Sequence, residues 1–403
     1  MNLLLKCKVF MMFNLAVLFL KIFYSHKKNF EGLTFEDWDI ANNLVKYGVY
    51  SEFMSVGPTA YKLPVYPLFL SLFIYIFGDH AKTAVILSQH FIFFLIPLLF
   101  ILISKIFNKD KIGILTGYLF IGSPAYFLYS NTLEITNVFI FIFLIFLYFF
   151  LVIWNGKYSW GHVIMLGISS AVLFLSQVVA VPLSMILLLC LLLFKKIKLK
   201  EMVAVLGIIG CLYTPWVARN YVTFNKIILS KSPVWQNIHF GYFHEVQVFE
   251  SLQKISLQKS SEIRKKRMHT DEFTMEKIYE KEVRSIEKNN PYVSLKKAAA
   301  NALMLWYVPS RYFYDSSPAV MGRKVYVIIL NFTVLISLIQ LYRHKKWELF
   351  LFSILLFGNF TVPYMIGQAG MTRFKLDFEW YQLFLAAYLV YNTVFNKYKK
   401  ETE

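Results

Sequence analysis

Apolar segments of about 20 residues recur along this chain, and that is the length a helix needs to cross a bilayer. Hydrophobic residues make up 57% of the 403 residues, whereas a soluble domain is about 45–50% apolar. We therefore predict an all-α polytopic membrane protein. The predicted spans are roughly 4–24, 83–106, 111–129, 134–154, 160–176, 178–194, 200–217, 324–342, 347–366 and 376–396.

The formal net charge of +18 fits basic cytoplasmic loops that face anionic lipid better than it fits a nucleic-acid partner. No nucleic-acid partner is therefore expected, and membrane lipids are. Cys7, Cys190 and Cys211 lie in or beside apolar segments, which argues against a disulfide framework. No spacing of cysteine or histidine resembles a metal site.

The apolar stretch 64–78 is short for a span, and the lysines of the other loops decide its orientation. If this stretch lies along the outer face without crossing, the strongest basic loops fall on the side of the N-terminus, as the positive-inside rule requires. We therefore predict about ten spans, two cytoplasmic termini and a juxtamembrane helix over 64–78. The lysines and arginine concerned are Lys105, Lys109, Lys111, Lys157, Lys195, Lys196, Lys198, Lys200, Arg343, Lys345, Lys346, Lys397, Lys399 and Lys400.

This orientation divides the chain into three regions. Residues 1–217 form an N-terminal transmembrane module that includes an outer loop over 25–82. Residues 218–322 form a large extracytoplasmic region, and residues 323–403 form a C-terminal transmembrane module. Within the large region, the pattern predicts an amphipathic helix over 271–289 and a second helix over 293–307.

Three acids, Glu36, Asp37 and Asp39, open a short helix predicted over 35–46 in the first outer loop. Acids in a first turn stabilise a helix N-terminus, which is one interpretation. The other is a general base that takes the proton of an attacking acceptor group. On a helix, Glu36 and Asp39 share a face and Asp37 points elsewhere. Glu134, in SNTLEIT, is either a second active-site carboxylate or an N-cap acid.

Three arginines are expected at the outer interface: Arg219 in PWVARNY, Arg311 in VPSRYFY and Arg373 in GMTRFK. Long basic side chains at this depth can simply extend to the interface. They can also form a clamp for a lipid-linked phosphate, because the planar guanidinium suits recognition of phosphate oxygens.

Four blocks in order resemble the GT-C superfamily of integral membrane glycosyltransferases. They are EDWDIANNL with the following GPTAYKLPVYPLFLSLF, then TPWVARNYVTFNKIILSKS, IEKNNPYVSLKKAAANALMLWY and TRFKLDFEWYQLFLAAYLV. The most similar group is the bacterial protein mannosyltransferase-like and aminoarabinose-transferase-like family. The chain departs from its usual Asp-Glu pair by the reversed order Glu36-Asp37, and Arg373-Phe374-Lys375 replaces Arg-Tyr-Arg.

The resemblance implies a GT-C-like helix bundle with juxtamembrane helices in the first outer loop and a mostly helical large outer loop. It implies inverting transfer of one sugar from a polyprenyl-phosphate donor to a lipid, glycan or protein acceptor, on the extracytoplasmic face of a bacterial inner (plasma) membrane. The essential acid of the family matches Glu36 or Asp39, and Arg373 carries over from the family's late motif better than Lys375. We expect Arg219 and Arg373 to hold the donor phosphate.

No cofactor is fixed by the resemblance. Some members of the superfamily use a divalent metal and others do not, and the outer-loop carboxylates could bind one. The alternatives are a transporter or flippase, or a polymerase, for lipid-linked glycans. A transporter predicts ionisable residues within the spans. The middles of the predicted spans are nearly free of acids and bases, which favours chemistry at the surface.

Overall fold

The computed structural model describes residues 4–395, and these form helices and loops with no β-strand among them. The chain divides into two compact units. Unit 1 combines Met1–Tyr50, Leu63–Ser230 and Leu383–Glu403, and unit 2 combines Ser51–Lys62 with Lys231–Gln382. The division of the chain by side of the membrane stays a prediction. Lys397, Lys399, Lys400 and the last residue of the predicted span 376–396 lie outside the described residues.

Unit 1 is built from long apolar helices around α7 (Thr136–Trp154), which packs against α4 (Ala81–Ile106) and α8 (Trp160–Phe174). Phenylalanines fill this contact, and Phe139, Phe143 and Phe146 are fully buried. The other long helices of the unit are α1 (Cys7–Lys27), α9 (Val181–Leu193) and α10 (Leu199–Phe224).

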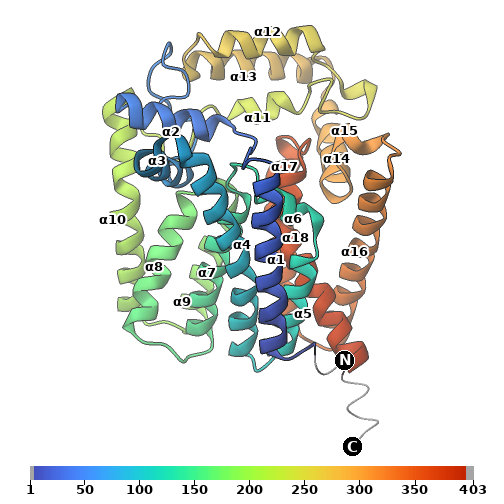
Figure 1. The fold of residues 1–403 in the computed structure, drawn as a ribbon. Coiled ribbons are helices and arrows are strands. Elements are labelled where there is room, and N and C mark those ends of the chain that lie inside the picture. Colours follow the sequence, from blue (N-terminus) through green and yellow to red (C-terminus); the bar gives the residue numbers. More distant parts are fainter. Residues whose placement is uncertain (1–3, 396–403) are drawn as a thin grey trace, which may run out of the picture. The chain divides into compact units, whose positions relative to one another are not determined.

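The first outer loop contributes two further helices to unit 1. The acidic segment forms α2 (Glu36–Tyr47), which ends where Gly48 adopts a left-handed φ of 69°. The stretch predicted as a juxtamembrane helix forms α3 (Val65–Phe77), separated from α4 by the 3₁₀ turn η1 (Gly78–His80). Figure 1 shows α2 lying crosswise to α1 and α4. The helix over 64–78 is therefore present, and its place along the membrane face stays a prediction.

The expected count of about ten spans is not confirmed. Six helical segments among the described residues are long and apolar enough to cross a membrane. They are Cys7–Lys27, Val65–Ile106, Thr136–Trp154, Leu199–Phe224, Pro318–Arg343 and Trp347–Ile366. The predicted span 111–129 is wrong as one helix, because the chain turns at Gly122 and Ser123. It forms α5 (Asp110–Ile121) and α6 (Pro124–Tyr129), with Pro124 in the first turn of the new helix.

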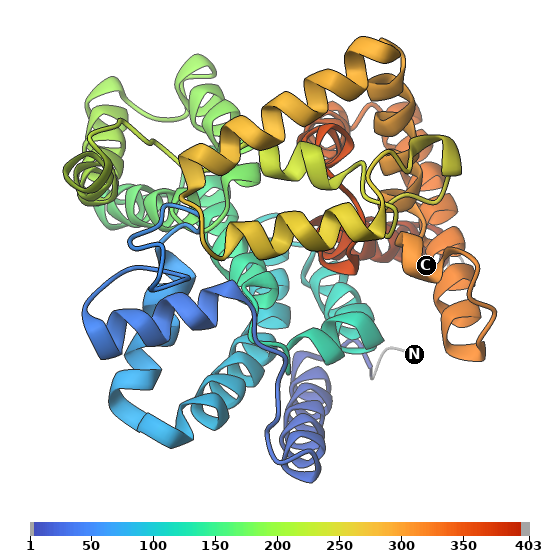
Figure 2. The same cartoon turned by 90° about the horizontal axis from the view of Figure 1, so that it is seen from above.

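Unit 2 combines a group of polar helices with apolar ones. The predicted helix over 271–289 is confirmed as α13 (Glu272–Asn289), whose N-cap Asp271 accepts from the Phe273 and Thr274 N–H groups. The second predicted helix is confirmed as α14 (Val293–Trp306). Figure 2 shows α11 (Trp235–Phe240) beside α13, and these two helices are in contact. The remaining helices are α12 (Leu257–Arg267), α15 (Ser310–Phe313), α16 (Pro318–Arg343) and α17 (Trp347–Ile366).

Helix α18 (Thr372–Val390), in which the predicted span 376–396 begins, carries ionisable residues near its N-terminal end. Lys375, Asp377 and Glu379 are all buried in it. Glu379 accepts two hydrogen bonds, at 2.9 and 2.5 Å, from the guanidinium of Arg323 in α16. The buried Glu379 carboxylate is tolerated because it is paired with Arg323. Because α18 contains several charged residues, it is not one of the six segments that are apolar enough to cross a membrane.

Candidate active site

The three acids of α2 differ in burial. Asp37 is only 6% exposed, Glu36 is partly buried and Asp39 is exposed. This follows from the helix, in which Asp37 lies on a different face from Glu36 and Asp39. Desolvation by its surroundings, together with the nearby Glu36 carboxylate, raises the pKa of Asp39. The acid that points into the protein is therefore Asp37.

Asp37 lies within electrostatic reach of the Tyr50 hydroxyl. Burial is the main cause that raises the pKa of Tyr50 far above its ordinary value, and the Asp37 carboxylate raises it further. Arg219 acts on the same hydroxyl in the opposite sense. The Tyr50 hydroxyl donates to the Leu63 carbonyl at 3.3 Å. Asp37, Tyr50 and Arg219 therefore share one electrostatic neighbourhood, although they come from separate parts of the sequence.

Arg219 donates to two oxygens and stacks against three aromatic rings. It donates to the Tyr50 carbonyl at 3.2 Å and to Asn220 Oδ1 at 2.9 Å. Its guanidinium carbon lies 5.1, 5.4 and 5.2 Å from the ring centres of Tyr50, Trp216 and Phe224. Such stacking holds the planar guanidinium in a fixed orientation.

The rest of the PWVARNY motif holds the turn that follows α10. Trp216 Nε1 donates to the Ser230 carbonyl at 3.0 Å, and Asn220 Nδ2 donates to the Ile228 carbonyl at 3.1 Å. The motif therefore ties the loop after α10 back to the helix on both sides of Arg219, which is a structural reason for Trp216 and Asn220.

Glu134 is buried, at 3% exposed, just before α7. Ile135 occupies the N-cap of that helix, so Glu134 precedes the cap position. Gln89 anchors the segment that precedes Glu134. The Gln89 amide donates to the carbonyls of Ser130 and Thr132 at 3.1 and 2.9 Å. Gln89 Oε1 accepts in turn from the Tyr66 hydroxyl at 2.8 Å. This network fixes the backbone next to Glu134.

Two buried carboxylates lie within electrostatic range of Tyr66. Asp37 from α2 and Glu134 from the segment before α7 both act electrostatically on the Tyr66 hydroxyl. The sequence singled out both acids, but Tyr50, Tyr66 and Gln89 were missed. The only available signal was the tyrosine-rich composition of residues 47–66.

Arg311 and Arg373 belong to unit 2, whereas Arg219 belongs to unit 1. Arg311 is exposed in α15 with its guanidinium 4.5 Å from the Tyr312 ring centre. Arg373, partly buried at the start of α18, lies 5.1 Å from the Phe374 ring centre. A joint phosphate clamp by these arginines stays a prediction.

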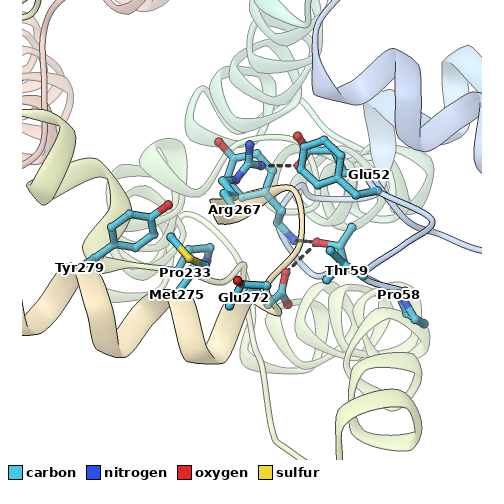
Figure 3. A pocket seen from close by; sticks show the side chains of 13 residues that line it. Glu52, Pro58, Thr59, Pro233, Arg267, Glu272, Met275 and Tyr279 are labelled. Atoms are coloured by element: carbon cyan, nitrogen blue, oxygen red, sulfur yellow. Dashed lines mark hydrogen bonds and ion pairs between the residues drawn. The ribbon is translucent and has the colours of Figure 1, made fainter. Parts of the chain in front are cut away.

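Unit 2 has a cavity of about 30 Å³ where Ser51–Lys62 packs against the α12–α13 corner, large enough for about one or two waters (Figure 3). Glu52 pairs with Arg267, and the Thr59 hydroxyl donates to Glu272 at 2.6 Å. The Ala60 N–H also donates to Glu272, at 2.9 Å. These bonds identify this cavity as a site where a loop is anchored.

Metal binding was tested against the donor set. Among residues 4–395, no three or more side chains of His, Cys, Asp and Glu are grouped so that they could hold a metal ion.

The comparison with protein families gives one match. Residues 58–217 match the family model described as dolichyl-phosphate-mannose-protein mannosyltransferase. The matched segment contains Tyr66, Gln89 and Glu134, and it ends just before Arg219. The match supports placement in the GT-C superfamily of membrane glycosyltransferases. No curated protein matches the chain.

Proposed function

We propose that this integral membrane protein is an inverting glycosyltransferase. It moves one sugar from a polyprenyl-phosphate-linked donor to a lipid, glycan or protein acceptor on the extracytoplasmic face of a bacterial plasma membrane. The observation that carries the proposal is that two buried carboxylates, Asp37 and Glu134, both lie within electrostatic range of the Tyr66 hydroxyl. One of these carboxylates and Tyr66 itself lie within the segment that matches the mannosyltransferase family.

Asp37 is the general base in this proposal, in preference to Glu36 or Asp39. A partly desolvated carboxylate that points into the protein can meet a bound acceptor, whereas an exposed one meets water. The acceptor hydroxyl attacks the anomeric carbon and loses its proton to Asp37. The bond from that carbon to the phosphate oxygen breaks, and the phosphate leaves with the electron pair. Direct displacement inverts the anomeric carbon.

Arg219 stabilises the phosphate leaving group in this mechanism. The guanidinium stays charged, and three aromatic rings and two oxygen acceptors fix its plane. Negative charge that develops on the departing phosphate is therefore met by a cation that needs little reorganisation. Arg373 and Arg311 are proposed as further phosphate ligands, and Glu134 as the carboxylate that orients the acceptor.

The proposal is tested with purified protein and a labelled polyprenyl-phosphate sugar, by measuring release of the sugar from the donor. Asp37→Asn keeps the size of the side chain but cannot take a proton, so we expect turnover to fall about 10²- to 10⁴-fold. Glu36→Gln and Asp39→Asn are the matched controls, and they should keep most of the activity. Wild-type turnover in the Asp37→Asn variant would exclude Asp37 as the base.

The transporter alternative gains no support from the buried charges of α18. A transport site needs ionisable groups that a substrate can reach. Glu379 is fully buried and accepts from both Arg323 nitrogens and, at 3.3 Å, from the Tyr326 hydroxyl. A structural pair accounts for these residues, so transport is not needed to explain them.

A further inference from the structure

Unit 1 contains a second cavity, of about 170 Å³, at the end of α1. One wall runs from Tyr24, in the last turns of α1, to Leu33 in the loop after it, and the other is the segment from Leu128 to Thr132. A site of this volume holds on the order of ten waters, which is the room that one sugar ring occupies.

The walls of this cavity are fixed in place. The Leu133 N–H donates to the Leu33 carbonyl at 2.9 Å, which ties the two segments together. At Gly32 the approach is so close that an added Cβ would lie 2.4 Å from the Asn131 carbonyl oxygen. Only glycine fits there. Asn29 and Phe30 both adopt left-handed backbone, each with φ of 52°, so the loop keeps an unusual shape.

Polar groups line the inner side of the cavity. The Ser25 hydroxyl donates to Asn131 Oδ1 and lies 2.7 Å from His90 Nε2. Asn131 Nδ2 is buried and makes no hydrogen bond within the described part of the chain. A buried donor without an acceptor is costly, and a ligand oxygen would remove that cost.

The rim of the cavity, in contrast, is partly apolar. Leu33 and Leu128 are 71% and 51% exposed, which gives the mouth an apolar edge. Lys28 and Glu31 also line it and carry opposite charges, so the rim has no net charge to attract a phosphate. The Lys28 ammonium lies over the Tyr24 ring, 5.1 Å from its centre. The lining fits an uncharged, hydroxyl-rich ring with an apolar tail.

We infer that this cavity is the subsite for the hydroxyl-rich headgroup of a membrane-anchored acceptor, with Asn131 Nδ2 as the donor that recognises it. The inference rests on the proposed function for its link to catalysis. Each wall of the cavity is only a few residues away, along the chain, from one of the two carboxylates of the proposed active site. The Leu33 wall continues into α2 and Asp37, and the Thr132 wall continues to Glu134. A headgroup held here can present a hydroxyl toward that pair.

The test uses the full chain in phosphatidylcholine nanodiscs, with no donor present. The probe is tritiated octyl glucoside below its micellar concentration, and octyl phosphocholine is the matched amphiphile without a sugar. We expect one saturable site per chain for the glucoside, above the background of empty nanodiscs, and none for the phosphocholine. Equal binding of the two amphiphiles would leave only a lipid groove and overturn the inference.

Two variants locate the binding. Leu128→Trp narrows the mouth at an exposed position and leaves the buried hydrogen bonds intact, so saturable binding should disappear. Asn131→Leu removes the recognising donor and should weaken binding about fivefold, the effect of one hydrogen bond. Wild-type binding by Leu128→Trp would refute the subsite. Turnover of the Asp37→Asn variant reports on the transferase assignment, and probe binding by the Leu128→Trp variant reports on the subsite, so failure of one can be told apart from failure of the other.

Discussion

Two buried carboxylates, Asp37 in unit 1 and Glu379 in unit 2, have surroundings of different kinds. Glu379 is fully buried against the paired nitrogens of Arg323 and the Tyr326 hydroxyl. Asp37 is 6% exposed and stands near two tyrosine hydroxyls and Arg219. Arg219 is itself stacked on aromatic rings. Burial alone therefore does not mark a catalytic acid.

These surroundings distinguish a carboxylate that stabilises the fold, Glu379, from one that is proposed to act in catalysis, Asp37. A carboxylate whose two oxygens are taken up by a fork of arginine nitrogens has little capacity left to accept a substrate proton. In the proposed function, the carboxylate of Asp37, near phenolic hydroxyls and a stacked arginine, receives a polar substrate, and the arginine receives the leaving phosphate. Loss of the Glu379 carboxylate should therefore affect folding, and loss of the Asp37 carboxylate should affect turnover.

The largest effect is expected from Glu379→Ala. The substitution leaves the Arg323 guanidinium, whose side chain is 22% exposed, without the carboxylate that pairs with it. Breaking a buried pair in this way costs about 3–5 kcal/mol. Thermal unfolding of the detergent-solubilised protein should show a marked loss of stability.

A double variant is the control for that experiment. Glu379→Leu combined with Arg323→Met removes both charges and keeps apolar volume, so much of the lost stability should return. If the double variant were as unstable as the single one, the pair would not be the cause.

A smaller effect is expected from Tyr66→Phe, on the Asp37 side of the comparison. The substitution removes the hydroxyl that donates to Gln89 and leaves a buried amide oxygen short of one partner. The expected loss of unfolding free energy is about 1–3 kcal/mol. The measurement is the same thermal unfolding, with Tyr75→Phe, at a 79% exposed tyrosine of the same helix, as the matched control.

The sequence was informative where a local rule decides the outcome. Acids at the start of α2, the N-cap Asp271 of α13 and the helix over 64–78 followed from patterns within one segment. The break of the predicted span 111–129 could also have been expected, because Gly122, Ser123 and Pro124 form a turn signal.

Other features depend on partners that are distant in the sequence. Glu379 is tolerated in α18 because Arg323 lies opposite it, and hydropathy along one segment cannot detect that pair. In the same way, the helical pattern separates Asp37 from Glu36 and Asp39, but it does not say which face is buried. That depends on how α2 packs against α3, so the order of preference among the three acids could not be derived beforehand.

The smallest effect is expected from Arg219→Lys, which tests whether the arginine near Asp37 is a ligand or a structural partner like Arg323. Lysine keeps the positive charge but loses the planar stacking on Tyr50, Trp216 and Phe224. Stacking of this kind is worth about 0.5–1 kcal/mol, so KM for the lipid-linked donor should rise about two- to fivefold while the unfolding temperature changes little. Steady-state kinetics with the labelled donor and thermal unfolding are measured on the same preparation. A large loss of stability with unchanged KM would assign Arg219 the same structural role as Arg323, and the contrast between the two carboxylates would then rest on Asp37 alone.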